Sequence, residues 1–390
     1  MTFELKRSYL YQIRVRYKNS TKRQKSAILN EFCLVCGYSR KYAIRICSGQ
    51  VQPRASRPGR KPDYAGVEFI HALVEIWKLT GRINSKMLKA AIPTWLPFLK
   101  DTSSSVKEKL LNVSAATIDR LLKPYKSKEK GRGLSSTRPS LLKNTIPLKL
   151  LEQSIVTTPG YVEVDTVAHC GESLAGEFVN TLTVTDLMSG WTENRALWSK
   201  TAEAVVKQLA QIESELPFDL VGLASDNGSE FINHELLKYL TTREAPINFV
   251  RRRPYKKNDN AHVEQKNYTH VRQLLGYERF DDVALVERIN EIYRVYFNTL
   301  RNFFIPSMKL AKKERIGAKV KKKYETPKTP YQRLLESPLV PSKKKKILRQ
   351  KFENLNPVFL ARQLDKKLKE LFELVDQSKR PQVGSLSSDT

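Results

Sequence analysis

Cysteine residues and long hydrophobic runs are scarce in this chain of 390 residues. Its four cysteines are too few for the disulfide framework of a small secreted protein. Cys33, Cys36 and Cys47 have no fourth zinc ligand close by, and the nearest histidine is His71, so we interpret them as small core residues. The first 20 residues are charged throughout and hold no signal peptide or membrane span. We therefore expect a cytosolic protein with no membrane association.

Charge is plentiful and mostly positive. The formal net charge is +29, with +22 in residues 1–150, −5 in residues 151–310 and +12 in residues 311–390. Basic flanks around a slightly acidic middle are expected when the flanks neutralise phosphates and the middle holds metal-binding carboxylates. Nucleic acid is therefore the predicted partner, although chains that bind ribosomes or other RNA can show the same balance.

Three acidic residues lie in local contexts that suit metal-dependent phosphoryl transfer. The apolar segment Leu220–Ser225 predicts a strand that ends at Asp226, and Asp259–Leu275 predicts a helix that carries Glu264. Asp165 lies in a segment of strict apolar and polar alternation, which predicts a half-buried strand. Mg²⁺ prefers a few carboxylates and keeps some of its water. Together the three contexts predict a magnesium site.

These motifs resemble the acidic triad of the retroviral-integrase-type transposase core found in bacterial insertion-sequence transposases. The matching residues are Asp165, Asp226 within SDNGSEF and Glu264 within NDNAHVEQKN, with 37 residues between the last two acids. The resemblance covers roughly residues 155 to 310. It implies an α/β ribonuclease-H-like core, with a mixed five-stranded sheet and flanking helices, in which the three acids are catalytic and bind metal.

The resemblance also implies an activity and its requirements. The protein would be a DNA transposase that cleaves DNA strands and transfers a 3′-hydroxyl end, which amounts to DNA integration at the ends of a mobile element. Two Mg²⁺ ions about 4 Å apart, replaceable by Mn²⁺, would support in-line displacement at phosphorus. No small-molecule cofactor is expected. The partners would be double-stranded DNA and further copies of the chain, in the bacterial cytosol at the nucleoid.

Other classes of protein remain as alternatives. A nuclease of the same fold would use the same acids without needing a long DNA-reading front, and a transposase-derived regulator would bind DNA without catalysis. A tyrosine recombinase would need a His-x-x-Arg element, which none of the five histidines provides. Within the site, four other acids are rivals for the metal: Glu163, Asp186, Glu230 and Asp259.

The sequence divides into six predicted regions. Residues 1–50 are expected to form a helix-turn-helix, with helices at Thr21–Phe32 and Tyr38–Cys47. Residues 64–125 predict a second helix-turn-helix-like domain, in which Ser114 is a helix N-cap. Residues 51–63 and 126–150 are predicted linkers. The catalytic core occupies 151–310, and 311–390 is a basic C-terminal region with an irregular Pro-containing stretch, an amphipathic helix and a disordered tail.

Within the core, three antiparallel strands are expected first, followed by alternating helices and strands. The expected strands are 161–168, 177–186, 191–197, 220–225 and 247–250, and the helices are 201–216, 234–241, 259–275 and 281–298. The side chains expected to contact DNA are basic, hydroxyl or amide groups in the two helix-turn-helix regions, the first linker and the core. They are Arg40, Lys41, Arg45, Arg57, Arg60, Lys61, Thr117, Arg120, Arg251, Arg252, Arg253, Asn260, Gln265, Lys266 and Asn267.

Overall fold

The computed structural model describes residues 2–50, 63–64, 66–100, 102–127, 157–225, 231, 233–251, 265–316 and 319–378. The chain forms two compact units, Met1–Asp63 and Tyr64–Thr390, which are described separately. Among the described helices, none is both long and apolar enough to cross a membrane.

The first unit is a group of three helices: α1 (Phe3–Lys18), α2 (Lys22–Cys36) and α3 (Arg40–Cys47). The sequence predicted α2 and α3 but not α1. Its many charged residues obscure the apolar pattern in the sequence, although Leu10 and Ile13 pack into the core. Gly37 ends α2 in the left-handed conformation (φ 68°), which glycine adopts without a Cβ penalty. Cys36 and Cys47 are buried in this core, in keeping with their interpretation as small apolar residues.

The second unit begins with a helical part. It consists of α4 (Val67–Leu79), α5 (Ser85–Trp95), the short 3₁₀ helix η1 (Leu96–Phe98), α6 (Ser104–Asn112) and α7 (Ala115–Lys126). Ser114 caps α7 as predicted, because its hydroxyl accepts a hydrogen bond from the Thr117 backbone N at 3.1 Å.

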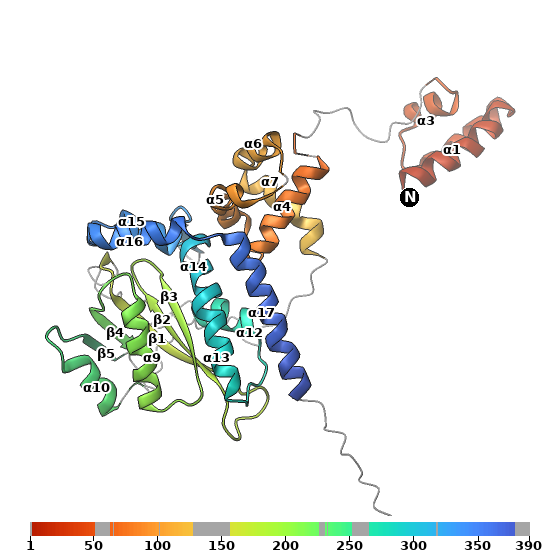
Figure 1. Ribbon diagram of the computed structural model, residues 1–390. Helices are drawn as coiled ribbons and strands as arrows, with labels where there is room; N and C mark the ends of the chain where they lie inside the picture. Colours follow the sequence, from red (N-terminus) through yellow and green to blue (C-terminus); the bar gives the residue numbers. More distant parts are fainter. Residues whose placement is uncertain are drawn as a thin grey trace, which may run out of the picture. The chain divides into compact units, whose positions relative to one another are not determined.

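A mixed five-stranded sheet follows, in the order β3-β2-β1-β4-β5 (Figure 1). Strand β1 pairs antiparallel with β2 and parallel with β4, while β2 and β3 are antiparallel and β4 and β5 are parallel. The strands are β1 (Tyr161–Ala168), β2 (Asn180–Asp186), β3 (Thr192–Leu197), β4 (Gly222–Ser225) and β5 (Asn248–Arg251). The expected mixed sheet is confirmed. Strand β1 has the predicted bounds, whereas β2 begins three residues later than predicted, β4 two residues later, and β3 and β5 one residue later.

Helices cover both faces of this sheet. On one face α9 (Ala202–Glu215) packs beside α10 (His234–Thr241), and the apolar residues of α9 share a core with β1 and β2. The other face is covered by a chain of helical segments backed by α17 (Figure 1). These are η4 (Asn267–Arg272), α12 (Gln273–Leu275), α13 (Ala284–Glu291), η5 (Ile292–Phe297), α14 (Asn298–Phe304) and α17 (Pro357–Ser378).

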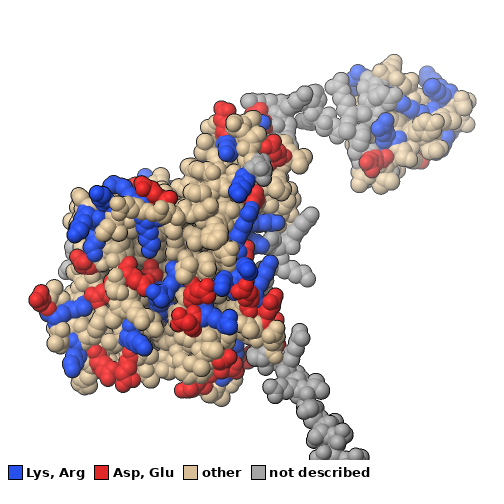
Figure 2. Space-filling view, in the orientation of Figure 1, with Lys and Arg blue, Asp and Glu red and all other residues tan. Residues whose placement is uncertain are grey.

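The C-terminal region differs from the expectation. The Pro-containing stretch was predicted to be irregular, but Pro330 opens α15 (Pro330–Glu336) at the first helical position, where its missing N–H costs nothing. Thr329 and Gln332 form a reciprocal capping box there, at 3.1 and 2.9 Å. Before it lies the hairpin β6 (Leu310–Ile316) and β7 (Lys319–Tyr324). The lysine run 343–346 lies in α16 (Ser342–Glu353), over which Figure 2 shows basic side chains.

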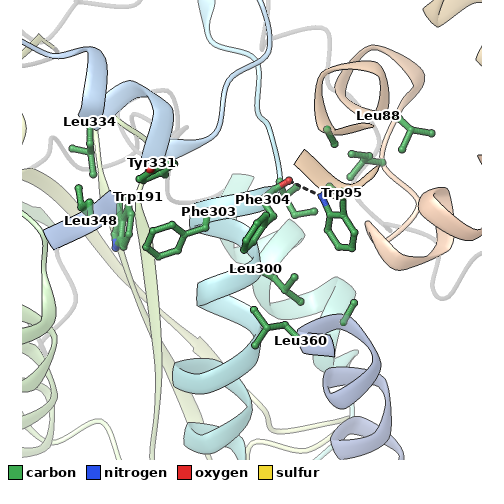
Figure 3. Close-up of a cluster of buried hydrophobic side chains, with 14 of the residues drawn as sticks. Leu88, Trp95, Trp191, Leu300, Phe303, Phe304, Tyr331, Leu334, Leu348 and Leu360 are labelled. Carbon is green, nitrogen blue, oxygen red and sulfur yellow. Dashed lines mark hydrogen bonds between the residues drawn. The ribbon is translucent and has the colours of Figure 1, made fainter. Parts of the chain in front are cut away.

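One hydrophobic core joins the helical part to the rest of the second unit (Figure 3). Trp95 at the end of α5 packs edge-on against Phe304 and donates its indole N–H to the Phe304 carbonyl at 3.1 Å. Tyr331 of α15 and Phe352 of α16 stack on each other, Phe352 also stacks on Phe303, and the Tyr331 ring contacts Phe303 at a tilt. The apolar stripe of α17, including Leu360, packs within this same chain.

Candidate active site beside β1 and β4

Asp165 lies on β1, the central strand of the sheet, with its side chain half-buried. Its Oδ1 accepts a hydrogen bond from the Thr166 backbone N at 2.8 Å, and its Oδ2 accepts one from Asn267 Nδ2 at 2.6 Å. Strand alternation places Asp165 on the opposite face from Val162 and Val164, which pack with α9. The carboxylate therefore faces η4, and an amide from η4 orients it.

Strand β4 is part of the segment predicted to lead to Asp226, and it lies beside β1 next to Asp165. It runs parallel to β1, and its buried last residue Ser225 pairs with Val164, the residue before Asp165. Because the two strands are parallel, their carboxyl ends point the same way, and such ends are where ligands bind in open α/β sheets. Asp226 follows Ser225 in the sequence and lies outside the described residues.

The third segment is the start of the helix predicted at 259–275. Its described part begins at Gln265, whose side chain is exposed, and includes the half-buried Lys266 and Asn267. Residues Asn267–Arg272 are π-helical, which the sequence did not predict. Wide turns of this kind are frequent at functional sites. Glu264 directly precedes Gln265 and lies outside the described residues.

Lys266 points to a different neighbour from Asn267. Its Nζ donates to the carbonyl of Gly190, in the turn between β2 and β3, at 3.2 Å. Burial, followed by repulsion from Arg301, Arg333 and Lys309, lowers the pKa of Lys266 to about 7. Asn267 therefore contacts the Asp165 carboxylate, while the preceding residue, Lys266, lies near Arg301, Arg333 and Lys309.

Two of the rival acids are described by the structure. Asp186 is buried and closes the β2–β3 turn, because its oxygens accept hydrogen bonds from Gly160 N at 2.9 Å and from Ser189 N and Oγ at 2.7 and 2.5 Å. Burial raises its pKa above the ordinary value. Glu163 lies on the same face of β1 as Asp165 and is 1% exposed. Asp186 is therefore a turn-stabilising residue, and Glu163 is far less accessible than Asp165.

Three of the predicted DNA-contacting residues of the first unit, Arg40, Lys41 and Arg45, lie on α3. Lys41 and Arg45 are exposed on its surface. Arg40 is also exposed, but its guanidinium donates hydrogen bonds to Asn30 Oδ1 and, at 2.8 Å, to Ser26 Oγ on α2. Lys41 and Arg45 are thus better placed than Arg40 to contact a ligand.

On α7 the two predicted contact residues bind each other. The Thr117 hydroxyl accepts hydrogen bonds from Ser114 Oγ at 3.0 Å and from Arg120 NH2 at 3.1 Å. Arg120 is exposed, and Thr117 is half-buried. Arg120 therefore remains available at the surface of this helix, while Thr117 contributes to its capping.

Several other predicted residues cannot be placed by the structure. Those outside the described residues are Arg57, Arg60, Lys61, Asp226, Arg252, Arg253, Asn260 and Glu264, together with the rival acids Glu230 and Asp259. Arg251 is the last residue of β5, and its backbone pairs with Ser225.

A metal at this site would require ligands from more than one segment. Within the described ranges, no three His, Cys, Asp or Glu side chains are grouped to hold an ion. Asp165 does supply a carboxylate, the oxygen donor that Mg²⁺ prefers, and both of its predicted partners, Asp226 and Glu264, lie outside the described residues. The chemistry of the donor set therefore suits a hard divalent cation.

Sequence reasoning missed two cations that bind the β2–β3 turn, Lys309 and Arg333, and a third, Arg301, that repels Lys266. Arg333 lies in TPYQRLL among apolar residues, and a charged residue in an apolar helix face is a weak signal of a buried polar role. The sequence gives no such signal for the other two. Arg301 lies within an ordinary helix pattern, and Lys309 lies after that pattern ends.

Comparison with known proteins places the chain in a family. No family model matches the sequence. A protein of Sinorhizobium fredii (strain NBRC 101917 / NGR234), called uncharacterized protein y4rM, is 39% identical over 334 residues, covering 82% of this chain and 91% of that protein. The chain belongs to the family of y4rM. Because y4rM is uncharacterized, membership of its family brings no activity with it.

Solved structures of retroviral integrase cores are also similar to parts of the chain. The HTLV-2 integrase catalytic core domain in complex with magnesium matches in a trimeric form (17% identity, TM-score 0.23, 28% of this chain and 66% of that chain) and a dimeric form (16%, 0.29, 38% and 91%). The catalytic core domain of BIV integrase matches at 17% identity and a TM-score of 0.27, over 44% and 91%. TM-scores this low do not establish a common fold.

Proposed function

We propose that this member of the y4rM family is a DNA transposase with an integrase-type core, which cleaves DNA strands and joins the freed 3′-hydroxyl end to target DNA. One observation carries the proposal: described residues next to the predicted acids in sequence lie close to Asp165. Ser225, the residue before Asp226, pairs with the residue before Asp165. Asn267, three residues after Glu264, donates a hydrogen bond to the Asp165 carboxylate at 2.6 Å.

In this proposal Asp165, Asp226 and Glu264 hold Mg²⁺, with Mn²⁺ as a substitute and two ions per site. Such ions, when bound, stabilise the charge that develops at the scissile phosphate and lower the pKa of an attacking water. Asn267 and the Thr166 backbone N orient the Asp165 carboxylate, as the outer partners of metal ligands generally do. Asn267 is accordingly a positioning residue.

DNA is the proposed substrate and partner. The exposed Lys41 and Arg45 of α3 and Arg120 of α7 would contact phosphates or bases, and the exposed lysines of α16 would add to the attraction. Joining two ends of one element to a target brings at least two sites together, so we expect a homo-oligomer on DNA. Light scattering of the complex with paired ends checks this, and a single chain per complex would contradict it.

The activity is tested with DNA from the two ends of the element that encodes the protein, with Mg²⁺ or Mn²⁺. We expect wild type to cleave and join these ends. Asp165→Asn should bind them equally well, yet lose activity by a factor of at least about 100, because a metal ligand supplies several kcal/mol at the transition state. Asp219→Asn is a matched control, since that aspartate is 87% exposed.

Three results would change the conclusion. Equal cleavage by Asp165→Asn and wild type would remove Asp165 from the site. Cleavage without joining would favour a nuclease of the same fold. Binding by wild type with neither reaction, in either metal, would favour a transposase-derived regulator.

A further inference from the structure

Three cationic side chains donate to the β2–β3 turn (Leu187–Gly190): Lys266, Lys309 and Arg333. Arg301 repels Lys266 from nearby, and we call the four side chains the cationic turn cluster. Lys309 Nζ donates to the first two carbonyls of the turn, at 2.6 Å for the first. Arg333 NH1 donates to the third at 3.1 Å, and Lys266 Nζ donates to the fourth at 3.2 Å. The four carbonyls of one turn thus bind cations from three separate segments.

The cluster has more hydrogen-bond donors than the turn has acceptors. An ammonium group has three donors and a guanidinium has five. Lys266 donates one hydrogen bond and Lys309 donates two. Arg333 is 7% exposed, and its buried Nε has no hydrogen-bond partner within the described part of the chain. Arg301 donates from its Nε to His270 at 3.5 Å. Counted over the described residues, N–H groups of the cluster therefore remain without an acceptor beside the turn.

Among the described residues, no carboxylate hydrogen-bonds to the cluster, although Glu325 and Glu336 attract Arg333. The hydrogen bonds of the cluster go to carbonyls, a hydroxyl and an imidazole of the described residues. The nearby Asp186 accepts its three hydrogen bonds from Gly160 and Ser189. Burial, and then repulsion from Arg333, lowers the pKa of Lys309 to about 8, against attraction from Asp186 and Glu325. Buried cations without a directly paired anion are costly, so a cluster with no hydrogen-bonded carboxylate among the described residues would be stabilised by binding an anion.

We propose that the cationic turn cluster is a phosphate subsite whose ligand is a phosphate of the DNA backbone. A phosphate offers several oxygens to the unused donors and supplies the missing negative charge. Lys266 and Asn267 are consecutive, and the second contacts Asp165, so the subsite adjoins the proposed catalytic carboxylate. The assignment to DNA rests on the proposed function. The affinity for phosphate does not.

A different role would have different consequences. If the cations only fasten the turn to α14 and α15, removing one should destabilise the protein whatever the buffer. If the cations instead form an anion site, removing one reduces the repulsion among them, so the variant stays stable in chloride. It loses only the additional stabilisation that phosphate gives to wild type. Lys309→Met and Lys266→Met each remove one charge while keeping the length of the side chain. Lys207→Met, at an exposed position on α9, is the matched control.

The test measures thermal unfolding of the full chain in sodium chloride and in sodium phosphate of equal ionic strength. Phosphate also stabilises proteins by exclusion from their surface, so the signal is the difference between variants. We expect phosphate to raise the unfolding temperature of wild type and Lys207→Met by roughly 2–4 °C more than that of the two cluster variants. An equal rise in all four proteins overturns the subsite, as does a cluster variant that fails to fold in chloride.

A second measurement separates DNA from free phosphate as the ligand. The dissociation constant for a random-sequence DNA duplex is measured against salt concentration. The logarithm of the binding constant falls linearly with the logarithm of the salt concentration, and each lost phosphate contact makes this negative slope shallower by about 0.9. We expect that change for Lys309→Met and none for Lys207→Met. An unchanged slope beside a lost phosphate response would overturn DNA as the ligand and leave a free-anion site. Neither measurement uses strand cleavage, so the outcome is independent of whether the protein is a transposase.

Discussion

Buried cations at two places beside the same sheet have different hydrogen-bond partners. Arg195 on β3 is fully buried, and it pairs with Glu193 at 3.1 Å and Glu215 at 2.6 Å. Asn298 completes that network by donating to Glu193 at 2.8 Å. The cationic turn cluster donates instead to carbonyls, which carry dipoles and no net charge. A buried cation that is paired with carboxylates stabilises the fold. Buried cations that are bonded only to neutral groups can in addition bind an anionic ligand.

The strongest test of this contrast is Arg195→Met. It leaves two carboxylates near β3 without their buried partner, so we expect a loss of about 3–5 kcal/mol in the free energy of unfolding. Urea unfolding measures it. Arg294→Met is the control, because Arg294 binds the same Glu215 at 2.9 Å with its side chain 48% exposed. That loss should stay below about 1 kcal/mol. Similar losses in both variants would contradict a special role for the buried network.

A smaller effect is expected at the edge of the sheet. The outer backbone groups of β3 would be unpaired, but Asn302 of α14 binds Thr192 N at 2.9 Å and Thr192 O at 3.0 Å. Asn290 of α13 binds both backbone groups of Ala196 in the same way, at 2.8 and 3.0 Å. The two amides therefore cover an edge that could otherwise pair with another strand.

Asn302→Leu should destabilise the protein by about 1–3 kcal/mol for each backbone group left buried and unpaired. Urea unfolding of this variant, compared with the exposed Asn112→Leu on α6, checks the value. If the two variants lose the same free energy, the amide of Asn302 does not protect the edge.

The smallest expected effect is a pH dependence at Lys309. Its pKa of about 8 in the folded protein lies below the ordinary lysine value, so the unfolded chain binds more protons between about pH 8 and 10. The folded state therefore gains stability as pH rises through this range, by at most about 1.4 kcal/mol per pH unit. Unfolding of wild type should show this gain relative to Lys309→Met in phosphate-free buffer. Parallel pH profiles would show that Lys309 titrates normally.

Much of the core was predictable from local patterns. Alternation in β1 and the apolar run of β4 end at positions set by turn residues, so Asp165 and the approach to Asp226 were correctly placed on strands. The N-cap at Ser114 was equally local. The capping box at Thr329 was present in the sequence too, but the prolines and lysines around it outweighed it, and α15 and α16 were missed.

Burial of polar residues was not predictable in the same way. The segment TENRAL of β3 alternates like a half-exposed strand, yet all six residues are buried. The backbone edge of β3 that faces away from β2 is hydrogen-bonded by the asparagines of α13 and α14, about 100 residues further along the chain. No local pattern contains that information, because it depends on which helix packs against which strand edge.

By itself the sequence determined the charge division of the chain, the strand that holds Asp165 and the order of the three acidic motifs, since each depends on neighbouring residues. Only the tertiary structure decided that Asn267 meets Asp165 and that Lys266, Lys309 and Arg333 meet one turn. Those contacts join segments far apart in sequence. They form because helices pack on a twisted sheet to bury apolar surface, and the positions of the polar side chains follow from that packing.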